Sequence, residues 1–354
     1  MTAVHFVVPD GIDDPARPSG GNAYDRQVRQ GLDSLGWSVR EHSVVGCWPR
    51  PDAAAFAALA GVVRQIPDGS VTLLDGLLAS TAPDVLVPQA RRLRLVVLVH
   101  TALGHRPADD GQETRMRERA VLSAAAAVVT TSAWSRRRLL ALYHLPPGRV
   151  HVAEPGVEAA ELAAGTVGDG ALLCVAAVSL EKGHDVLLDA LLTLSDLPWR
   201  CVCVGSLERD PAFVGDLRRR ALDGGLGDRV HFAGPLAASD VASAYAAADL
   251  LVVASRAESY GMVVTEALAR GLPVIAAEVG GLTEALGYGA DGIRPGLLVA
   301  PGDPAAFAAA LRTWLCDHAL RARLRRAACE RRESLCRWST TASVVAGVLA
   351  EVSR

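Results

Sequence analysis

The sequence predicts an α/β protein with two doubly wound domains in tandem. Short apolar runs alternate with longer amphipathic segments rich in Ala and Leu along nearly the whole chain. This alternation is typical of βαβ units, in which helices cover both faces of a parallel sheet. The chain has 354 residues, of which 50% are hydrophobic, and this is enough for two domains that each bury a core.

In the first half, the apolar runs are expected to be strands and the segments between them helices. The expected strands are 3–8, 37–42, 70–74, 94–99, 126–130 and 149–152, and the expected helices are 22–35, 52–64, 112–123 and 133–143. The stretch 154–170 is rich in Gly, Ala and Glu and has no apolar face, so it is predicted to be a linker. We therefore assign residues 1–156 to an N-terminal domain.

The second half repeats the alternation and predicts a second domain at 157–335. The expected strands are 171–177, 200–204, 229–233, 249–253, 273–277 and 297–299, and the expected helices are 184–195, 211–223, 240–247, 260–270, 282–286, 304–315, 318–334 and 340–352. In doubly wound sheets ligands bind at the carboxyl ends of the strands. The natural ligand site of this pair of domains is therefore the cleft between them.

Composition disfavours several classes of protein. A net charge of −3 argues against a nucleic-acid-binding protein. The start of the chain has no signal-peptide pattern, and no run approaches the ~20 apolar residues of a membrane span, so a cytoplasmic protein is expected. None of the seven cysteines forms a C-x-x-C pair, and Cys201 and Cys203 are expected to pack on one face of a strand. A P-loop is absent, and no G-x-G-x-x-G follows the first strand of either half, which disfavours nicotinamide and flavin enzymes.

The sharpest motif lies in residues 257–286, where Glu258 and Glu266 flank the start of a predicted helix. They are eight positions apart, which places their backbones ~12 Å apart along a helix axis. That is too far for two carboxylates acting on one bond, but it suits two anchors at opposite ends of an extended ligand. The helix start between them would offer N–H groups to a phosphate. From the residues alone, two solvated helix glutamates remain an equal alternative.

This motif, E-S-Y-G-x4-E, is followed by Gly271-Leu272-Pro273 and Gly280-Gly281. Together they resemble the donor site of retaining GT-B glycosyltransferases, most closely glycosyltransferase family 4 (glycosyl transferases group 1). The resemblance covers most of 171–316 and, more loosely, the first half. It implies that Glu258 faces hydroxyls of the transferred sugar and that Glu266 binds the ribose hydroxyls of the nucleotide. It also implies that amides near Tyr260, Gly261 and Met262 meet the distal phosphate.

The same resemblance gives Lys182 the position of a lysine that binds the donor diphosphate. The family's arginine position holds Ala177, so a substitute such as Arg256 or Arg209, weaker donor binding or lost activity remain open. Gly205 matches a loop that approaches the nucleobase and phosphates.

In the first half, Gly20-Gly21 matches a glycine loop whose amides touch the donor phosphate, with unusual φ and ψ values expected for the glycines. His100 matches a histidine beside the sugar ring. The acceptor side could be lined by His105, Asp75, Asp109 and Asp110. Residues 336–354 match a helix that in relatives packs back on the N-terminal domain.

The resemblance thus implies a GT-B enzyme for carbohydrate biosynthesis, with Lys182, Glu258 and His100 as its catalytic residues. It would move a sugar from a nucleotide-sugar to a hydroxyl of a small molecule, glycan or lipid with retention of configuration, and the departing phosphate would accept the proton. The Lys182 ammonium would stabilise charge on the leaving diphosphate, so no metal or other cofactor is expected. Two alternatives remain: a non-catalytic nucleotide-sugar-binding homologue or partner subunit, suggested by Ala177, and a nucleotide-sugar epimerase.

Overall fold

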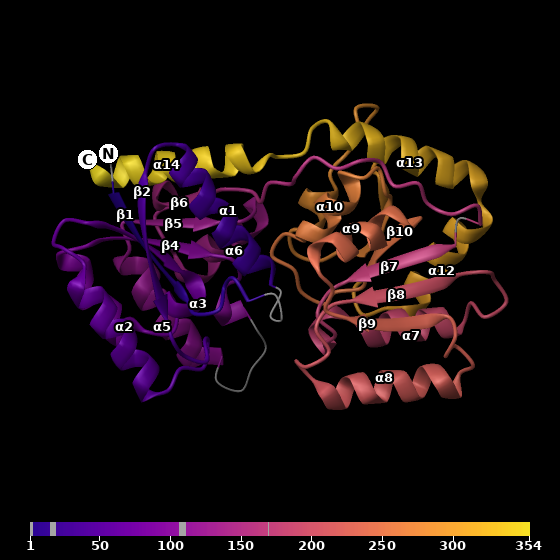
Figure 1. The fold of residues 1–354 in the computed structure, drawn as a ribbon, viewed down its shortest axis with the longest axis horizontal. Helices are drawn as coiled ribbons and strands as arrows, with labels where there is room; N and C mark the ends of the chain where they lie inside the picture. The colour runs from indigo at the N-terminus through magenta and orange to yellow at the C-terminus, as the bar shows by residue number, and fades with distance from the viewer. Residues whose placement is uncertain (1–2, 15–18, 106–110, 169) are drawn as a thin grey trace. The chain divides into compact units, whose positions relative to one another are not determined.

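The computed structural model describes residues 3–14, 19–105, 111–168 and 170–354 (Figure 1). The chain divides into two compact units. The first unit consists of Met1–Gly156 together with Cys336–Arg354, and the second of Val157–Leu335. Each unit is built around its own six-stranded parallel sheet, which confirms the predicted fold class.

The sheet of the first unit has the strand order β2-β1-β3-β4-β5-β6, and all its neighbouring strands are parallel. The strands are β1 (Ala3–Pro9), β2 (Ser38–Val44), β3 (Val71–Asp75), β4 (Arg94–Val99), β5 (Ala127–Thr130) and β6 (Val150–Val152). The long helices are α1 (Gly20–Ser34), α2 (Ala53–Gln65), α5 (Gly111–Ala124), α6 (Ala133–Tyr143) and α14 (Trp338–Ser353). The order of strands reverses direction between β1 and β3, so the ends of these strands mark the switch point at which such folds bind ligands.

Helix α14 returns to the first unit and packs along α1. Gly31 of α1 allows close packing, because a Cβ atom there would lie 2.3 Å from the Cβ of Ala342. The hydroxyl of Thr341 donates to the carbonyl of Glu154 at 2.6 Å. Apolar residues of α14, including Val345 and Leu349, join the core on one face of the sheet.

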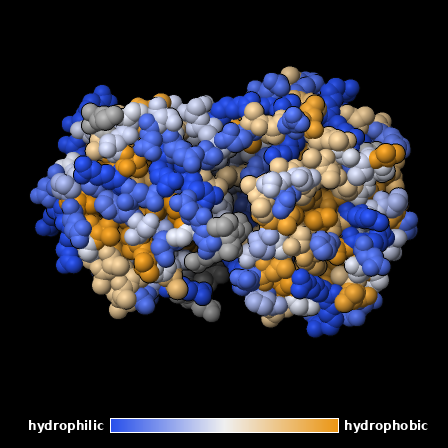
Figure 2. All heavy atoms as spheres, in the orientation of Figure 1, coloured by the Kyte–Doolittle hydropathy of each residue, from blue (hydrophilic) through white to orange (hydrophobic). Residues whose placement is uncertain are grey.

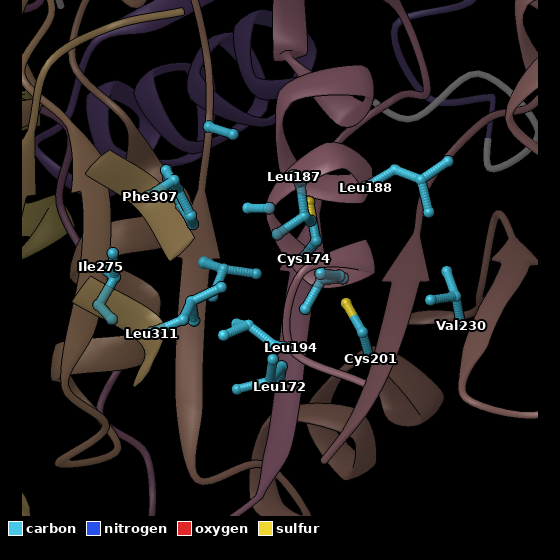
Figure 3. Close-up of a cluster of buried hydrophobic side chains, with 14 of the residues drawn as sticks. Leu172, Cys174, Leu187, Leu188, Leu194, Cys201, Val230, Ile275, Phe307 and Leu311 are labelled. Carbon is cyan, nitrogen blue, oxygen red and sulfur yellow. The ribbon is translucent and has the colours of Figure 1, made fainter. Parts of the chain in front are cut away.

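The sheet of the second unit has the order β12-β11-β10-β7-β8-β9. Its strands are β7 (Ala171–Val175), β8 (Arg200–Val204), β9 (Val230–Gly234), β10 (Leu250–Val253), β11 (Val274–Ala277) and β12 (Gly296–Val299). The helices are α7 (His184–Leu192), α8 (Pro211–Asp223), α9 (Ala238–Ala246), α10 (Met262–Leu268), α11 (Leu282–Leu286), α12 (Pro304–Cys316) and α13 (His318–Arg332). Figure 3 shows one of the two cores that cover this sheet, with Cys174 and Cys201 among leucines of β7 and α7.

Several expectations need correction. Gly20 and Gly21 are not a loop but the first turn of α1, and neither has a positive φ. The helix expected at 260–270 begins only at Met262, because Gly261 adopts a left-handed conformation with φ of 96°. The short helices α3 (Gly76–Ala79) and α4 (Pro83–Leu86) were not expected.

The described residues of the predicted linker form no helix or strand, but from Val157 onward they belong to the second unit. Asp249 accepts hydrogen bonds from the backbone and hydroxyl of Thr166 and from the backbone of Ala171, and it pairs with Arg325. The amide of Ala163 donates to the carbonyl of Arg270 at 2.9 Å. Residues 157–168 are therefore attached to the second unit by these hydrogen bonds.

Candidate functional site

Lys182 and Glu258 are in direct contact in the second unit. The ammonium of Lys182 donates to Oε1 of Glu258 at 2.5 Å, and the hydroxyl of Ser255 donates to the same oxygen at 3.1 Å. Both members of the ion pair are mostly buried, with side-chain exposures of 21% and 15%. The two residues that the sequence placed 76 positions apart thus share one site.

Glycines bring the two loops together. Gly183 follows Lys182 with φ of 69°, and a Cβ atom there would lie 1.9 Å from the carbonyl oxygen of Ala254 at the end of β10. Gly280 has φ of 57°, and its Cβ would lie 1.6 Å from the carbonyl oxygen of Glu258. Since no side chain fits at either position, these glycines fix the backbone on both sides of the ion pair.

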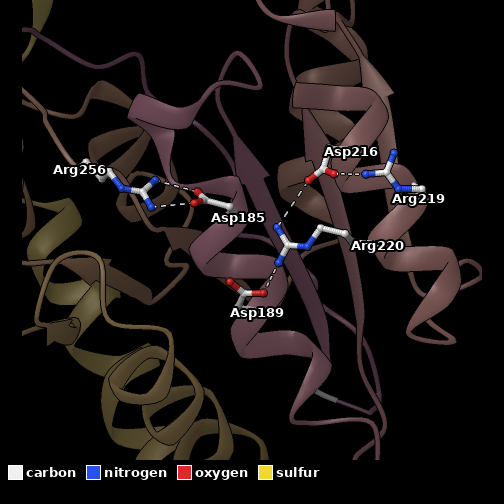
Figure 4. A network of polar contacts seen from close by, with 6 residues as sticks. All are labelled: Asp185, Asp189, Asp216, Arg219, Arg220 and Arg256. Atoms are coloured by element: carbon white, nitrogen blue, oxygen red, sulfur yellow. Dashed lines mark hydrogen bonds and ion pairs between the residues drawn. The ribbon is translucent and has the colours of Figure 1, made fainter. Parts of the chain in front are cut away.

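Arg256 ties the loop of Lys182 to the loop of Glu258. Its guanidinium makes two hydrogen bonds of 2.7 Å to the carboxylate of Asp185 on α7, and one terminal nitrogen also donates to the carbonyl of Leu180. Figure 4 shows this side-by-side pairing. Both terminal nitrogens are therefore engaged, and Arg256 here holds the Lys182 loop instead of taking the place of an arginine at Ala177. The other suggested substitute, Arg209, is exposed in the loop after β8.

Glu266 lies one turn into α10 and is held by a residue that the sequence did not single out. The hydroxyl of Tyr245 donates to Oε2 of Glu266 at 2.8 Å, and the guanidinium of Arg270 stacks over the Tyr245 ring at 4.7 Å. Burial raises the pKa of Glu266, although the Tyr245 hydrogen bond and the charge of Arg270 oppose the shift. No hydrogen bond from a described residue reaches Oε1 of Glu266, and no interaction within the described ranges joins Glu266 to Lys182 or Glu258.

The predicted phosphate-binding backbone lies between the two glutamates. The side chain of Tyr260 is buried in the core, Gly261 has a left-handed backbone, and Met262 is the first residue of α10. The first turn of α10 has no side-chain cap. Gly205, at the end of β8, approaches the carbonyl of Ala176 so closely that a Cβ atom would lie 2.1 Å from it.

In the first unit, His100 faces two carboxylates at the switch point of the sheet. Its Nε2 lies 2.8 Å from Oδ1 of Asp25 and 3.4 Å from Oδ2 of Asp75. Asp75 ends β3, His100 follows β4, and Asp25 comes from the first half of α1. Gly21 lies against the ring, since a Cβ atom there would be 3.2 Å from Cδ2 of His100. The structure therefore brings together three predicted residues, Gly21, Asp75 and His100, with Asp25, which sequence reasoning missed.

Asp25 is fully buried, and its Oδ2 has no hydrogen-bond partner among the described residues. Burial raises the pKa of Asp25 to about 7, although His100 opposes the shift. A sequence signal for Asp25 exists: it falls on the same stripe of α1 as the buried Val28 and Leu32, three and seven residues later. A carboxylate on an apolar stripe needs a partner, and His100 is that partner.

A second missed residue, Glu118 of α5, holds the segment that follows His100. It is fully buried and accepts hydrogen bonds from the backbone amides of Leu103 and Gly104 and from the hydroxyls of Ser80 and Tyr143. This carboxylate is satisfied within the fold. Of the acceptor candidates, Asp109 and Asp110 lie outside the described residues.

Cys201 and Cys203 are buried in β8, as predicted. Cys203 lies opposite Cys174 on the neighbouring strand β7, and both are free thiols. The two sulfurs and a nitrogen of His184 lie within 4.8 Å of one another. This donor set resembles that of zinc sites. In the metal-free protein the hydrogen bond to Cys203 and burial both raise the pKa of the Cys174 thiol well above its ordinary value.

On the face shown in Figure 2, hydrophobic and hydrophilic residues are interspersed over each unit. Within the described parts of the chain, no helix combines the length and apolar character needed to cross a bilayer.

Solved structures share this fold along almost the whole chain. A sucrose-phosphate synthase from Thermosynechococcus elongatus superposes with a TM-score of 0.79 at 21% identity and covers 99% of both chains. The Anabaena protein HepE, solved with UDP and glucose, gives a TM-score of 0.77 at 19% identity over 99% of this chain and 100% of that one. At such identities the likeness establishes the fold, which is the GT-B fold of glycosyltransferases.

The family follows from the sequence matches. Residues 3–161 match the family described as Glycosyltransferase Family 4, and residues 166–331 match Glycosyl transferases group 1. The chain therefore belongs to these family 4 glycosyltransferases, as the motif resemblance predicted.

Curated relatives include D-inositol 3-phosphate glycosyltransferases. The protein from Catenulispora acidiphila is 35% identical over 257 residues, which cover 66% of this chain and 59% of the relative. The protein from Kineococcus radiotolerans is 38% identical over 251 residues, which cover 64% of this chain and 57% of the relative. The matched region thus spans less than two thirds of these relatives.

Proposed function

We propose that this protein transfers a sugar from a nucleotide-sugar donor to an acceptor hydroxyl with retention of configuration and without a metal ion. The observation that carries the proposal is the contact between Lys182 and Glu258 at the carboxyl end of the second sheet. A cation and a carboxylate side by side suit a ligand that carries a diphosphate next to sugar hydroxyls. Membership of a glycosyltransferase family supports this assignment.

The proposed roles follow from the hydrogen-bond donors and acceptors that each side chain has left unused. One proton of the Lys182 ammonium is donated to Glu258, and the other two remain for oxygens of the diphosphate. Lys182 and Ser255 both donate to Oε1 of Glu258, which leaves Oε2 to accept from a sugar hydroxyl. On α10, Oε1 of Glu266 is left for the ribose, while Tyr245 fixes the other oxygen.

In the proposed reaction, the bond between the anomeric carbon and the diphosphate oxygen breaks. The acceptor oxygen forms its bond to that carbon on the same face of the sugar, and its proton passes to the departing phosphate oxygen. Charge accumulates on the leaving diphosphate, so a preorganised cation lowers the barrier. Lys182 supplies this charge.

The absence of an arginine at Ala177 makes Lys182 more important. Lys182 is the only lysine in the sequence, and all other side chains counted as Lys or Arg are arginines. A second candidate function, a nucleotide-sugar-binding homologue without transfer activity, is favoured by Ala177 alone, because that replacement removes a fork of phosphate contacts.

Because the sequence has a single lysine, amine acylation gives a direct test of donor binding. We expect a bound nucleotide-sugar to protect Lys182 from acetylation, as measured by mass spectrometry of the peptide, while the α-amino group is labelled at an unchanged rate. UDP-glucose is the first donor to test, because HepE was solved with it; GDP-, ADP- and dTDP-sugars follow in the same assay.

A transfer assay with the protecting donor then separates the two candidate functions. Inositol phosphate is the first acceptor to try, because the names of the curated relatives include it. Transfer that persists in the presence of EDTA supports the metal-independent enzyme. Protection without transfer or donor hydrolysis would select the non-catalytic homologue, and the absence of protection by every donor would contradict both.

A further inference from the structure

The imidazole of His100 uses a single nitrogen to face two buried carboxylates. Nε2 lies 2.8 Å from a carboxylate oxygen of Asp25 and 3.4 Å from one of Asp75. A ring nitrogen of His100 and one carboxylate oxygen of each aspartate all lie within 4.8 Å of one another. The side chain of Asp25 is 1% exposed, that of Asp75 4% and that of His100 15%. The ring is therefore the only member of this Asp–His–Asp cluster with an appreciable solvent-facing surface.

The position of the carboxylates fixes a proton on Nε2. Ionised carboxylates only accept hydrogen bonds, so the nitrogen between them has to be a donor. Oδ1 of Asp75 accepts from the backbone amide of Leu77 at 2.6 Å, which orients Oδ2 toward His100. On the far side of the ring, no described residue forms a hydrogen bond with Nδ1 of His100.

The charge of the cluster favours a second proton, on Nδ1. Burial opposes a charged ring, but Asp25 and Asp75 more than compensate and raise the pKa of His100 to about 10. The titratable groups that face the ring from packed elements, within the described ranges, are Asp25, Asp75 and Tyr24. The ring of Tyr24 meets His100 edge-on, and its hydroxyl is engaged with the carbonyl of Ala153, so Tyr24 adds no charge.

We propose that Asp25 and Asp75 hold His100 as an imidazolium, so that Nδ1–H donates a hydrogen bond to a hydroxyl oxygen of a carbohydrate or polyol substrate. Asp25 is then a positioning residue that acts through His100. This inference rests on the proposed function for the nature of the substrate. It goes beyond that function because it assigns the charge of His100 and gives a role to a residue outside the matched motifs.

The chemistry of the cluster selects the kind of substrate oxygen. One imidazolium and two carboxylates leave an excess of negative charge when both acids are ionised, and this disfavours a phosphate next to the ring. A hydroxyl oxygen accepts from Nδ1–H without adding charge. An imidazolium also has no lone pair to take a proton, so His100 is not the base of the reaction.

Nuclear magnetic resonance of the substrate-free protein tests the charge. In protein labelled with ¹⁵N-histidine, both ring nitrogens of His100 should show imidazolium shifts from about pH 6 to pH 9. Comparison with His100→Asn assigns the signal among the nine histidines. In Asp25→Asn, which keeps an acceptor oxygen but loses the charge, the titration of His100 should move down by at least one pH unit, roughly a tenfold change in proton affinity. A neutral ring in the wild type at pH 7, or an unchanged titration in the variant, would overturn the proposal.

Kinetics then test the consequence. In Asp25→Asn, kcat should fall about tenfold or more and should decline further as pH rises through the lowered pKa of His100. In the wild type, kcat should not decline over that pH range. Asp75→Asn, which retains the cap on Leu77, is the second variant if Asp25→Asn folds poorly. Asp33→Asn, at an exposed position of the same helix, is the matched control and should leave kcat unchanged.

A loss of activity that is the same at every pH would reduce Asp25 to a structural residue and refute the assigned role. Because the resonance experiment uses no substrate, it still decides the charge of His100 if the protein proves not to transfer sugars.

Discussion

Replacing Lys182 by methionine should lower kcat by about 10²- to 10³-fold while the protein stays folded. The side chain keeps its approximate length and loses only the ammonium. Two unit charges ~4 Å apart in an effective dielectric of ~20 interact by about 4 kcal/mol. The part of this attraction that grows as the diphosphate departs lowers the barrier, and ~3–4 kcal/mol corresponds to the stated factor. Among the described residues around Lys182 we expect no second cation to compensate, because Ala177 stands at the family's arginine position and Arg256 is engaged with Asp185.

The same change leaves Glu258 without its cation, although Ser255 still donates to it. We therefore expect a loss of stability of about 1–3 kcal/mol, which urea denaturation can measure. Kinetics with the donor identified by protection should show the loss mainly in kcat. Lys182→Arg retains the charge on a wider head group and should keep part of the activity. Arg218→Met, at an exposed position of α8, is the control. A kcat for Lys182→Met within about threefold of wild type would refute the charge-stabilising role.

Three further predictions concern the supports of the two sites. Tyr245→Phe removes the hydrogen bond to Glu266, so it should weaken nucleotide binding several-fold. Because the pKa of Glu266 is already raised, the loss of nucleotide affinity should be greater at acid pH. Calorimetry at two pH values that gives equal losses of affinity would contradict this prediction. Arg256→Gln frees the loop of Lys182 and should raise the KM for the donor about tenfold with little change in Tm; an unchanged KM would show that the loop holds its position unaided. Because the pKa of His100 is raised from 6.5 to about 10 in the folded protein, its contribution to stability is complete below about pH 6.5 and is lost as pH rises through about 10. Urea denaturation at a series of pH values should show this fall, on the order of 5 kcal/mol, and a stability that does not change over this range would refute it.

The strand and helix positions could be predicted because their signals are local. The run 95–99 is continuously apolar, and the structure buries these residues of β4 in an interior strand. The start of α10 was misplaced by two residues, since the sequence does not show that Gly261 is left-handed. The linker at 154–170 looked unattached because its anchor, Asp249, lies about 80 residues away.

The site could be predicted only where a motif carries it. Lys182 and Glu258 were found through the family motif, and their contact follows from glycines whose close approaches involve distant carbonyls. Tyr245 is 21 residues from Glu266, and Asp25 is 75 residues from His100. No local periodicity joins such pairs, because the contact is made by the packing of separate βαβ units. A buried carboxylate on an apolar stripe nevertheless shows that a partner exists, even though it does not identify it.

Each unit thus holds a cation against carboxylates before any substrate is bound: Lys182 against Glu258, and His100 against Asp25 and Asp75. This pairing has a cost, because a carboxylate next to the cation weakens its attraction for an anion. It also has a benefit, because a cation that is already oriented needs no rearrangement when charge develops on the leaving group. Under the proposed function, a donor diphosphate in the second unit would share Lys182 with Glu258, which favours a moderate affinity for the nucleotide and a strong interaction with the transition state. Because the interaction is then stronger in the transition state than in the bound ground state, it raises kcat.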